Sequence, residues 1–419
     1  MGFSYKEIET QSREEINQNA LEQINRILSQ VENTPYYKGK LPKEIECLND
    51  FSKLPLLSKD DLRKAFPFGM LSCPKEDIVR MNASSGTTGI PTLSYCNKND
   101  LDSFTQNEAL HFSHTGLSQK DIMQVMVGCN LFTAGWGCYH GGIELGASII
   151  PSGPGNTERQ INLLKQLKPN YCFSNPSYLQ HLLEMISQED WKNISLKTAI
   201  TGGEVLTKEF QKLAKEKYNL EIYNFYGMTE FSTHIASECH LHNGLHINEN
   251  CFWPEIIDPE TGQVLPDGEY GELVLTDLRR EAMPLIRYRT GDCTRIIPEE
   301  CSCGRTHRRI ETITHRIDDM MIINGVNIFP SQIEECIYRS FDCATNYLIY
   351  LKKKEHLTKM HIDIEVKKEL LENKCEIKNL EKNLMNTLKS YITIKPKLNF
   401  VVTGTLPEIT GKTKRIVIK

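Results

Sequence analysis

Several features that would place a protein in a membrane are missing from this sequence. No segment approaches the ~18 uninterrupted apolar residues of a transmembrane helix. The first residues, MGFSYKEIETQSREEINQ, are polar and acidic, without the basic start and apolar stretch of a signal peptide. Lys6 also breaks the pattern for myristoylation after Gly2. These absences predict a cytoplasmic protein that binds no membrane.

Internal repeats, low-complexity tracts and a large excess of one charge are missing as well. The formal net charge is -5 over 419 residues, which gives no strong attraction to nucleic acid. Hydrophobic and charged fractions of 39% and 25% lie near the averages for globular proteins. A chain of this length exceeds the size at which one hydrophobic core stops growing, so we expect two or three domains.

Cysteine, in contrast, is plentiful. The chain has 14 cysteines and no export signal, so we expect thiols or metal ligands rather than disulfides. Two short segments, ECHLHNGLH (238–246) and ECSCGRTH (300–307), contain three cysteines and several histidines. A set of three cysteines and one histidine suits a tetrahedral zinc ion. The alternative is a group of reduced thiols that bind no metal.

The hydrophobic pattern and the composition of the sequence change twice along the chain. From about residue 120, short apolar runs alternate with amphipathic stretches, which predicts an α/β body with a largely parallel sheet. After residue 250, Pro and Gly turns separate short alternating runs, as in an antiparallel subdomain. Residues 331–419 hold 17 Lys plus Arg against 11 Asp plus Glu, a net charge of +6 that leaves -11 for residues 1–330. We therefore expect a small basic module after an acidic body.

The segment ASSGTTGIPT (83–92) has the composition of a loop that wraps an anion. Its glycines let backbone N–H groups approach a phosphate, and its hydroxyls add further donors. It lacks the lysine of a P-loop, and the pattern GxxxxGK[ST] occurs nowhere in the chain, which argues against a P-loop NTPase. A flexible surface loop is the alternative. The candidate phosphate-binding residues are Ser84, Ser85, Gly86, Thr87, Thr88 and Gly89.

A candidate for the missing positive charge lies near the other end of the chain. Lys412 follows a glycine in LPEITGKTKR, within the basic module. Taken alone, an exposed surface lysine would be the ordinary interpretation. A lysine on a separate module can, however, enter and leave a site in the body.

Three further motifs lie between these two segments: YNFYGMTE (223–230), YRTGD (288–292) and HRIDDMMIINGVNIFP (315–330). In this order, all five resemble the core motifs of the adenylate-forming superfamily of acyl-coenzyme A ligases, adenylation domains and luciferases. The phenylacetate-coenzyme A ligase branch is more similar still, with LFTAGWGCYHGGIELGA, TGGE, PLIRYRTGD and GKTKR among the matching segments. The resemblance covers nearly the whole chain.

The resemblance implies a site for ATP and Mg²⁺. Tyr226 would stack on adenine, Thr229 would bind the α-phosphate, and Glu230 would help to hold Mg²⁺. Asp292 would bind the ribose hydroxyls with help from Arg316. The structural alternatives are a helix-start carboxylate for Glu230 and a turn residue for Asp292. The remaining nucleotide-binding positions implied are Gly203, Glu204, Gly227 and Met228.

The same resemblance implies two domains with a hinge. Residues 1–317 would form the N-terminal adenylation domain, with mostly parallel sheets plus an antiparallel subdomain, and 318–419 a small mobile α+β domain. Asp318 would be the hinge. Lys412 would bridge the carboxylate and the α-phosphate during adenylation, and a rotation about Asp318 would withdraw it before thiol attack.

Zinc and the acid site are implied by similarity to the same branch. Members of the branch carry a structural zinc, and the matching ligands are Cys239, His246, Cys301 and Cys303, with His242 as the alternative histidine. The acid pocket would be formed by Phe132, Trp136, Tyr139 and Gly202, although Trp136 could instead be core packing. Cys129, Asn130 and Trp136 depart from the phenylacetate pattern, which favours another aryl or arylalkanoic acid.

We therefore expect an AMP-forming ligase that joins such an acid to coenzyme A through an acyl-adenylate. Two alternatives stay open: transfer of the acyl group to an amine or a carrier-protein thiol, and a non-catalytic protein that has kept the scaffold. The expected partners are the acid, ATP and coenzyme A. The sequence decides neither the acid nor the oligomeric state, for which a homodimer is one option.

Overall fold

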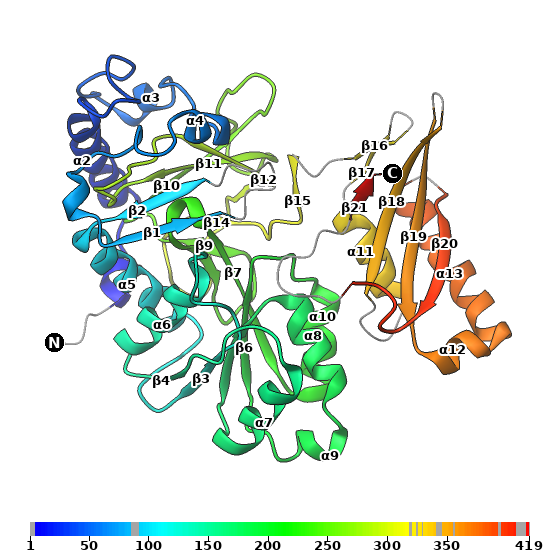
Figure 1. The fold of residues 1–419 in the computed structure, drawn as a ribbon. Coiled ribbons are helices and arrows are strands. Elements are labelled where there is room, and N and C mark those ends of the chain that lie inside the picture. Colours follow the sequence, from blue (N-terminus) through cyan, green and yellow to red (C-terminus); the bar gives the residue numbers. More distant parts are fainter. Residues whose placement is uncertain are drawn as a thin grey trace.

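The computed structural model describes residues 5–84, 92–317, 321–323, 326–328, 330–340, 346–354, 357–392, 395–407 and 416–418. It consists of a large body and a smaller part at the C-terminal end (Figure 1). We call the described residues from 321 onward the C-terminal module. No helix among the described residues is both long and apolar enough to cross a bilayer.

The centre of the body is a nine-stranded sheet in the order β13-β14-β9-β8-β7-β6-β5-β3-β4. Strands β4, β3, β5, β6 and β7 pair in parallel, and the others pair antiparallel. The strands are β3 (Ile122–Val125), β4 (Ser148–Ile150), β5 (Tyr171–Ser174), β6 (Thr198–Gly202), β7 (Glu221–Met228), β8 (Thr233–Glu238), β9 (Leu245–Ile247), β13 (Ile296–Ile297) and β14 (Arg309–Ile310).

Helices cover both faces of the parallel strands, as such sheets require. Side chains on one face, such as Phe173 of β5, pack against α5 and α6, while Cys172 beside it faces α7, α8 and α10. The parallel strands are therefore continuous apolar runs. The helices are α5 (Lys98–Ser113), α6 (Ala134–Glu144), α7 (Thr157–Leu167), α8 (Pro176–Met185), α9 (Gln188–Trp191) and α10 (Lys208–Tyr218).

A second sheet of the body is antiparallel, in the order β10-β11-β12-β15, and the hairpin β1-β2 forms a separate sheet. The N-terminal helices pack against the core of this region, with Ile24, Leu28 and Phe51 buried in it. The elements are α1 (Tyr5–Ile8), α2 (Arg13–Val31), α3 (Leu48–Phe51), α4 (Lys59–Lys64), η1 (Lys75–Asp77), β1 (Arg80–Ala83), β2 (Leu93–Cys96), η2 (Thr229–Phe231), β10 (Phe252–Ile257), β11 (Gly271–Asp277), β12 (Tyr288–Thr294) and β15 (His315–Arg316).

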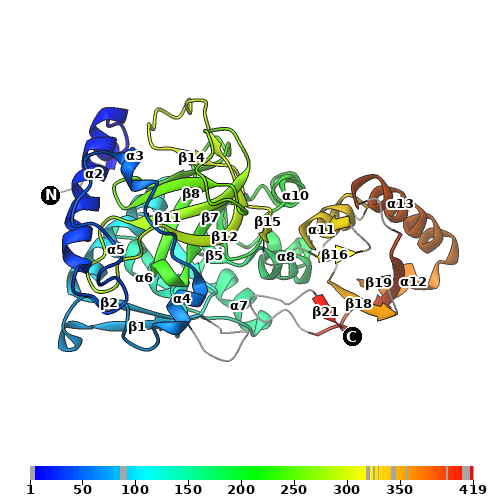
Figure 2. The same ribbon diagram turned by 90° about the horizontal axis from the view of Figure 1, so that it is seen from above.

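The C-terminal module has a core of its own, in which Ile349, Ile362 and Leu388 are fully buried. Its sheet has the order β20-β19-β18-β21, next to a β16-β17 hairpin. It stands to one side of the body in two perpendicular views (Figures 1 and 2). The elements are β16 (Met321–Ile323), β17 (Val326–Ile328), α11 (Pro330–Ser340), β18 (Tyr347–Lys354), β19 (Leu357–Val366), α12 (Lys368–Glu372), α13 (Lys374–Ile392), β20 (Lys397–Val402) and β21 (Ile416–Ile418).

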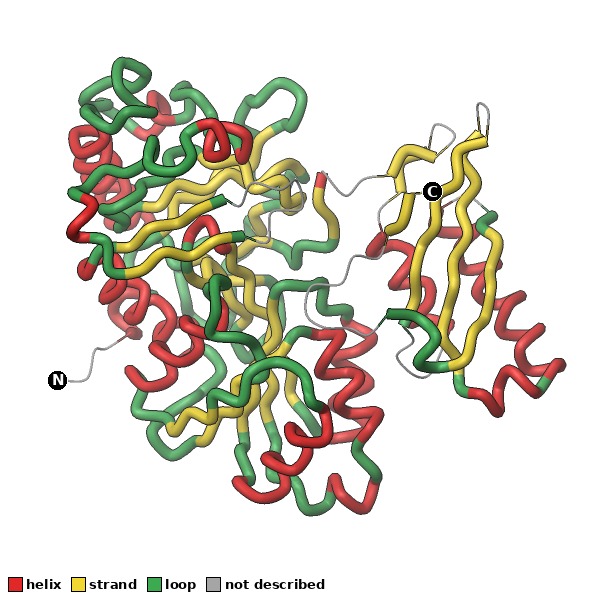
Figure 3. Tube along the Cα trace, viewed as in Figure 1, coloured by secondary structure: helices red, strands yellow, loops and turns green. Residues whose placement is uncertain are grey.

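The predicted fold class is confirmed. Strands and helices alternate from β3 to β7 as the sequence pattern requires, and β10 to β12 form the antiparallel part (Figure 3). The boundary at 317/318 stays a prediction. Asp318, the predicted hinge, lies outside the described residues, between β15 and β16.

Candidate active site

Three strands bring Tyr226, Asp292 and Arg316 together. The Tyr226 hydroxyl donates to Asp292 Oδ2 over 2.6 Å, and Arg316 Nη1 donates to Asp292 Oδ1 over 2.6 Å. Asp292 and Arg316 are cross-strand partners in the β12–β15 pair, which sets this contact. Burial, and then the Asp292 carboxylate, raise the pKa of Tyr226 well above its usual value. The carboxylate is thus held from two sides at the edge of the antiparallel sheet.

Glu230 lies on the short turn η2, directly after β7, and is only 4% exposed. Its Oε1 atom is buried and accepts no hydrogen bond within the described ranges, although Lys59 Nζ lies 3.2 Å away. A buried carboxylate oxygen whose one charged neighbour among the described residues is this lysine could also bind a hard cation. Thr229 begins the same turn. Lys59, at the start of α4, was not predicted as a site residue, since SKDD reads only as a helix start.

A buried arginine supports this turn. Arg280 is fully buried, and its Nη1 donates to the Glu230 carbonyl over 2.5 Å. The same guanidinium donates to the Tyr95 carbonyl over 2.9 Å and to Ser94 Oγ, both on β2. Arg280 therefore connects Glu230 with β2, the strand that follows the segment 85–91 in the sequence. Sequence reasoning missed Arg280, because no local pattern distinguishes it from Arg279.

Of the predicted phosphate-binding loop, the structure describes Ser84 alone. The Ser84 N–H donates to the Thr92 carbonyl over 2.9 Å, and the Thr92 N–H donates to Ser84 Oγ over 3.2 Å. These two bonds bring the ends of the loop together. The predicted residues Ser85, Gly86, Thr87, Thr88, Gly89, Asp318 and Lys412 lie outside the described residues.

The TGGE segment lies at the carboxyl end of β6. The Glu204 Oε2 atom accepts from the Ser177 N–H over 3.1 Å, so this carboxylate caps the start of α8. Gly203 adopts a left-handed φ of 81°. In the neighbouring β7, Gly227 and Met228 pair with His234 and Thr233 of β8. These predicted positions therefore gather at the carboxyl ends of β6 and β7, where parallel sheets bind ligands.

The predicted acid-pocket residues lie on and before α6. Phe132 is 45% exposed just before the helix. The Trp136 Nε1–H donates to the Asn130 carbonyl over 2.9 Å, and its ring stacks on His140 with centroids 6.2 Å apart. Tyr139 contacts His140 edge-on. Trp136 is half-buried, so it is not the core residue that the alternative interpretation required.

The cysteine and histidine segments converge on one point. The ligand atoms of Cys239, His246, Cys301 and Cys303 all lie within 4.8 Å of one another. The Cys239 and Cys301 sulfurs are 3.9 Å apart, and Cys303 Sγ lies 3.4 Å from His246 Nε2. The edges of a zinc tetrahedron with these donors are about 3.3–3.8 Å. Burial lowers the pKa of His246 to about 3, which keeps the imidazole in the neutral, metal-binding form. The residues present therefore fit zinc.

The alternative histidine has other partners. His242 Nδ1 lies 2.9 Å from Glu238 Oε2, and its Nε2 lies 3.0 Å from Glu221 Oε1. All cysteines in the described ranges are free of disulfide bonds.

A buried network that the sequence did not reveal surrounds the cysteine cluster. The Arg305 Nε–H donates to Glu9 Oε1 over 2.7 Å, and His114 Nε2 contacts the same carboxylate oxygen. Ser237 Oγ then connects His114 Nδ1 (2.8 Å) with His111 Nδ1 (2.9 Å). Glu9 stands far from its partners in sequence, so no spacing pattern could have identified it.

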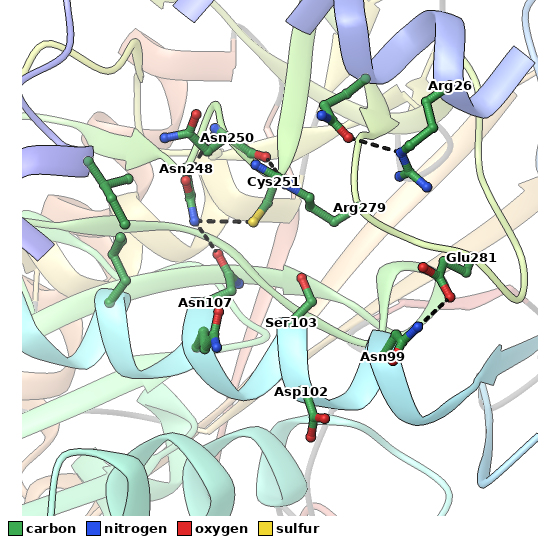
Figure 4. A pocket seen from close by; sticks show the side chains of 14 residues that line it. Arg26, Asn99, Asp102, Ser103, Asn107, Asn248, Asn250, Cys251, Arg279 and Glu281 are labelled. Atoms are coloured by element: carbon green, nitrogen blue, oxygen red, sulfur yellow. Dashed lines mark hydrogen bonds between the residues drawn. The ribbon is translucent and has the colours of Figure 1, made fainter. Parts of the chain in front are cut away.

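A cavity of about 710 Å³ lies between α2, α5 and two turns of the second sheet. Arg26, Asn107, Cys251 and Glu281 are among its lining residues, and Asn248 bridges Asn107 and Cys251 (Figure 4). None of the residues predicted from the sequence lines it.

Comparison with known proteins gives two family matches. Residues 12–277 match the model for AMP-binding enzymes, and residues 325–419 match the AMP-binding enzyme C-terminal domain. Phenylacetate-coenzyme A ligase of Pseudomonas putida is 36% identical over 417 residues, which covers 97% of this chain and 94% of the relative. The ligase of the same name from Escherichia coli is also 36% identical, with 92% and 90% covered.

Solved structures match the fold. A 2-hydroxyisobutyryl-CoA ligase in its postadenylation state, in complex with 2-HIB-AMP, has a TM-score of 0.90 at 23% identity and covers 98% of this chain and 91% of that chain. The same ligase in its thioesterification state, with the same adenylate and CoA, has a TM-score of 0.72 at 24% identity, again with 98% and 91% covered.

Proposed function

The chain belongs to the AMP-binding enzyme family, and from this premise we propose that it is an AMP-forming ligase that joins an aryl or arylalkanoic acid to coenzyme A. The observation that carries the proposal is the full-length identity of 36% to phenylacetate-coenzyme A ligases. The arrangement of Asp292 and Glu230 supports it, because both carboxylates lie next to β7: Asp292 accepts from Tyr226 of this strand, and Glu230 follows its end.

In the first half-reaction, a carboxylate oxygen of the acid attacks the α-phosphorus of ATP. The bond between this phosphorus and the bridging oxygen to the β-phosphate breaks, and pyrophosphate leaves. Asp292 binds the ribose hydroxyls with Arg316 beside it, and Tyr226 stacks on adenine. Thr229 donates to the α-phosphate, and Glu230 would hold Mg²⁺. When bound, Mg²⁺ supplies positive charge against the phosphate oxygens.

Lys412 supplies the mobile positive charge for this step. The ammonium bridges the acid's carboxylate and the α-phosphate, while the hydroxyl-rich loop 84–89 holds the β- and γ-phosphates. In the second half-reaction, coenzyme A loses its thiol proton, its sulfur attacks the acyl carbon, and AMP leaves. A rotation about Asp318 removes Lys412 before this step. The two TM-scores for one ligase in two states support a fold that can adopt both arrangements.

Cys239, His246, Cys301 and Cys303 would hold a structural zinc ion. Such an ion supplies cross-links between β8, β9 and the loop 301–307, and takes no part in the chemistry. Burial opposes ionisation of Cys303, but the hydrogen bond and charge of Arg305 outweigh it, so the pKa of this thiol is below its usual value.

The test is an incubation with ATP, Mg²⁺ and a panel of aryl acids, first with hydroxylamine as the trap and then with coenzyme A or a panel of amines. We expect AMP, pyrophosphate, a hydroxamate and, with coenzyme A, a thioester. Formation of ADP would contradict the reaction. Amides without a thioester would point to the alternative acceptor.

A further inference from the structure

A histidine and a glutamate that have no role in the mechanism above lie buried under the carboxyl ends of β5 and β7. His234 Nδ1 is 2.6 Å from Glu108 Oε2, and the two side chains are 6% and 2% exposed. Glu108 comes from the middle of α5, and His234 from β8. A charged pair this far from solvent is costly to bury unless its groups are well partnered.

The carboxylate of Glu108 is fully occupied by donors. Its Oε1 accepts from Thr233 Oγ1 over 2.7 Å and from the His234 N–H over 2.9 Å. Donors on both of its oxygens favour the ionised form of this buried carboxylate. An ionised carboxylate only accepts, so the proton between the two side chains lies on Nδ1 of His234. In the neutral imidazole, Nε2 is then an acceptor.

Two glycines make room for this pair. A Cβ on Gly137 of α6 would lie 2.4 Å from Glu108 Oε1, so only glycine lets α6 rest on the carboxylate. A Cβ on Gly227 of β7 would lie 3.0 Å from His234 Cδ2, the ring atom next to Nε2. The imidazole edge that carries Nε2 therefore lies directly against the strand that leads into Thr229 and Glu230.

The other ring nitrogen of His234 is Nε2. Within the described residues, His234 Nε2 takes part in no hydrogen bond, and it is not among the polar atoms that are both fully buried and unpartnered. It therefore keeps some accessible surface. The ring is otherwise surrounded by Phe112, Phe173 and Phe225, with centroids 5.3 to 6.2 Å away.

Phe173 connects the His234 ring with the predicted acid pocket. Phe173 contacts His234 and also lies 3.8 Å from where a Gly202 Cβ would be. Gly202 and α6 are the predicted borders of the acid pocket. The acid's carboxylate has to lie near Thr229, and in this proposal its other end lies among the three phenylalanines that surround the His234 ring. This end of the acid would be an aromatic ring. It would lie in an apolar recess that contains one hydrogen-bond acceptor, Nε2 of His234.

We propose that His234, oriented by Glu108, is the specificity-determining residue of the acid pocket, and that it selects an aryl acid with a hydrogen-bond donor, a hydroxyl or amino group, on its ring. This inference rests on the proposed function. An unsubstituted ring would leave the acceptor unpaired, and such a loss typically costs about 10- to 100-fold in discrimination.

The experiment compares kcat/KM at one fixed pH for matched acids, namely phenylacetate and benzoate with and without a ring hydroxyl or amino group. In the unaltered protein, we expect the better hydroxy or amino acid to exceed its unsubstituted parent by about 10- to 100-fold. In His234→Phe the ratio should fall to about one. His111→Phe, at a buried α5 histidine bonded to Ser237, is the matched control and should keep the ratio.

A second variant tests the orientation of the ring. In Glu108→Gln the amide can donate to Nδ1, which moves the ring proton to Nε2 and makes that atom a donor. The preference should then shift from the hydroxy acid toward its methoxy counterpart, a change that a purely structural role would not cause. If His234→Phe does not fold, this shift decides the question.

The outcomes separate this inference from the proposed function. If no acid in the panel gives AMP, the proposed function fails and the inference fails with it. If acids are activated but the unaltered protein prefers the unsubstituted ring, or if His234→Phe lowers kcat/KM equally for both acids, the inference alone is overturned.

Discussion

The body and the C-terminal module differ in how their polar groups are held. In the body, Asp292, Glu230 and Glu108 are buried and contacted by side chains from distant segments. Between body and module, the ion pair of Arg339 with Glu209 spans 3.7 Å, with both side chains largely exposed. Exposed pairs contribute little, at most about 1 kcal/mol. The polar groups of the body are therefore held in fixed contacts, whereas this ion pair by itself adds little to the stability of the junction.

This difference predicts which substitutions should slow each half-reaction. A residue of the body that holds the nucleotide acts in both half-reactions, because the adenylate stays bound through both. In the proposed mechanism, a residue that the module carries in and out would act in only one of them. Variants in the two regions should therefore give different ratios between adenylation and thioester formation.

The largest effect is expected for Lys412→Ala. Loss of the ammonium should slow adenylate formation by about 100- to 1,000-fold, because in the proposed mechanism this charge bridges the acid's carboxylate and the α-phosphate. Thioester formation from supplied acyl-adenylate should be retained. The measurement is a pair of assays, pyrophosphate release and thioester yield. If Lys412→Ala lowered pyrophosphate release and thioester yield equally, the proposed difference between the module and the body would be wrong.

A smaller but broader effect is expected for Asp292→Ala. The change removes the acceptor for the ribose and leaves Arg316 without this carboxylate, which should raise KM for ATP by about 10- to 100-fold. Both half-reactions should suffer, unlike with Lys412→Ala. Asp102→Ala, at an exposed carboxylate on α5, serves as the control. A defect confined to adenylation would mean that Asp292 does not hold the nucleotide.

Within the body, Cys301→Ser tests the cysteine cluster. Metal analysis of the freshly purified protein should give about one zinc per chain and almost none in the variant. We expect Tm to fall, since the ion would cross-link β8, β9 and the loop 301–307, while the ratio of the two half-reactions should not change. Cys47→Ser, at an exposed thiol, is the control. Unaltered protein without zinc would refute the metal assignment.

The smallest effect is expected at the junction. Glu209→Lys places like charges opposite Arg339, which should change the free energy of unfolding by less than about 1 kcal/mol. Urea denaturation checks this, and the two half-reaction assays show whether the balance between them shifts by more than a few fold. A large loss of stability would mean that the junction is a fixed interface.

Patterns of local sequence predicted much of this molecule. The alternation of apolar runs led to the parallel strands, and the turn-rich segment after residue 250 led to β10 and β11. Motif resemblance singled out Tyr226, Asp292 and Arg316, which do meet in space. Each of these signals lies within a few residues of the element it describes, which is why sequence alone could reveal it.

The groups that sequence reasoning missed all depend on distant partners. Arg280 reaches β2 across 185 residues, and Glu9 reaches Arg305 across 296. His242 and His246 stand in the same short segment, and only tertiary contacts direct one of them to Glu238 and Glu221. Buried partners of this kind produce no local pattern in the sequence.

The most direct test of the central claim follows an oxygen atom. An aryl acid labelled with oxygen-18 in its carboxylate is incubated with the protein, ATP, Mg²⁺ and coenzyme A, and the products are analysed by mass spectrometry. The account predicts one labelled oxygen in AMP and none in pyrophosphate, because the attacking carboxylate oxygen stays with the α-phosphorus. Label in inorganic phosphate together with ADP, or unlabelled AMP beside the thioester, would contradict it.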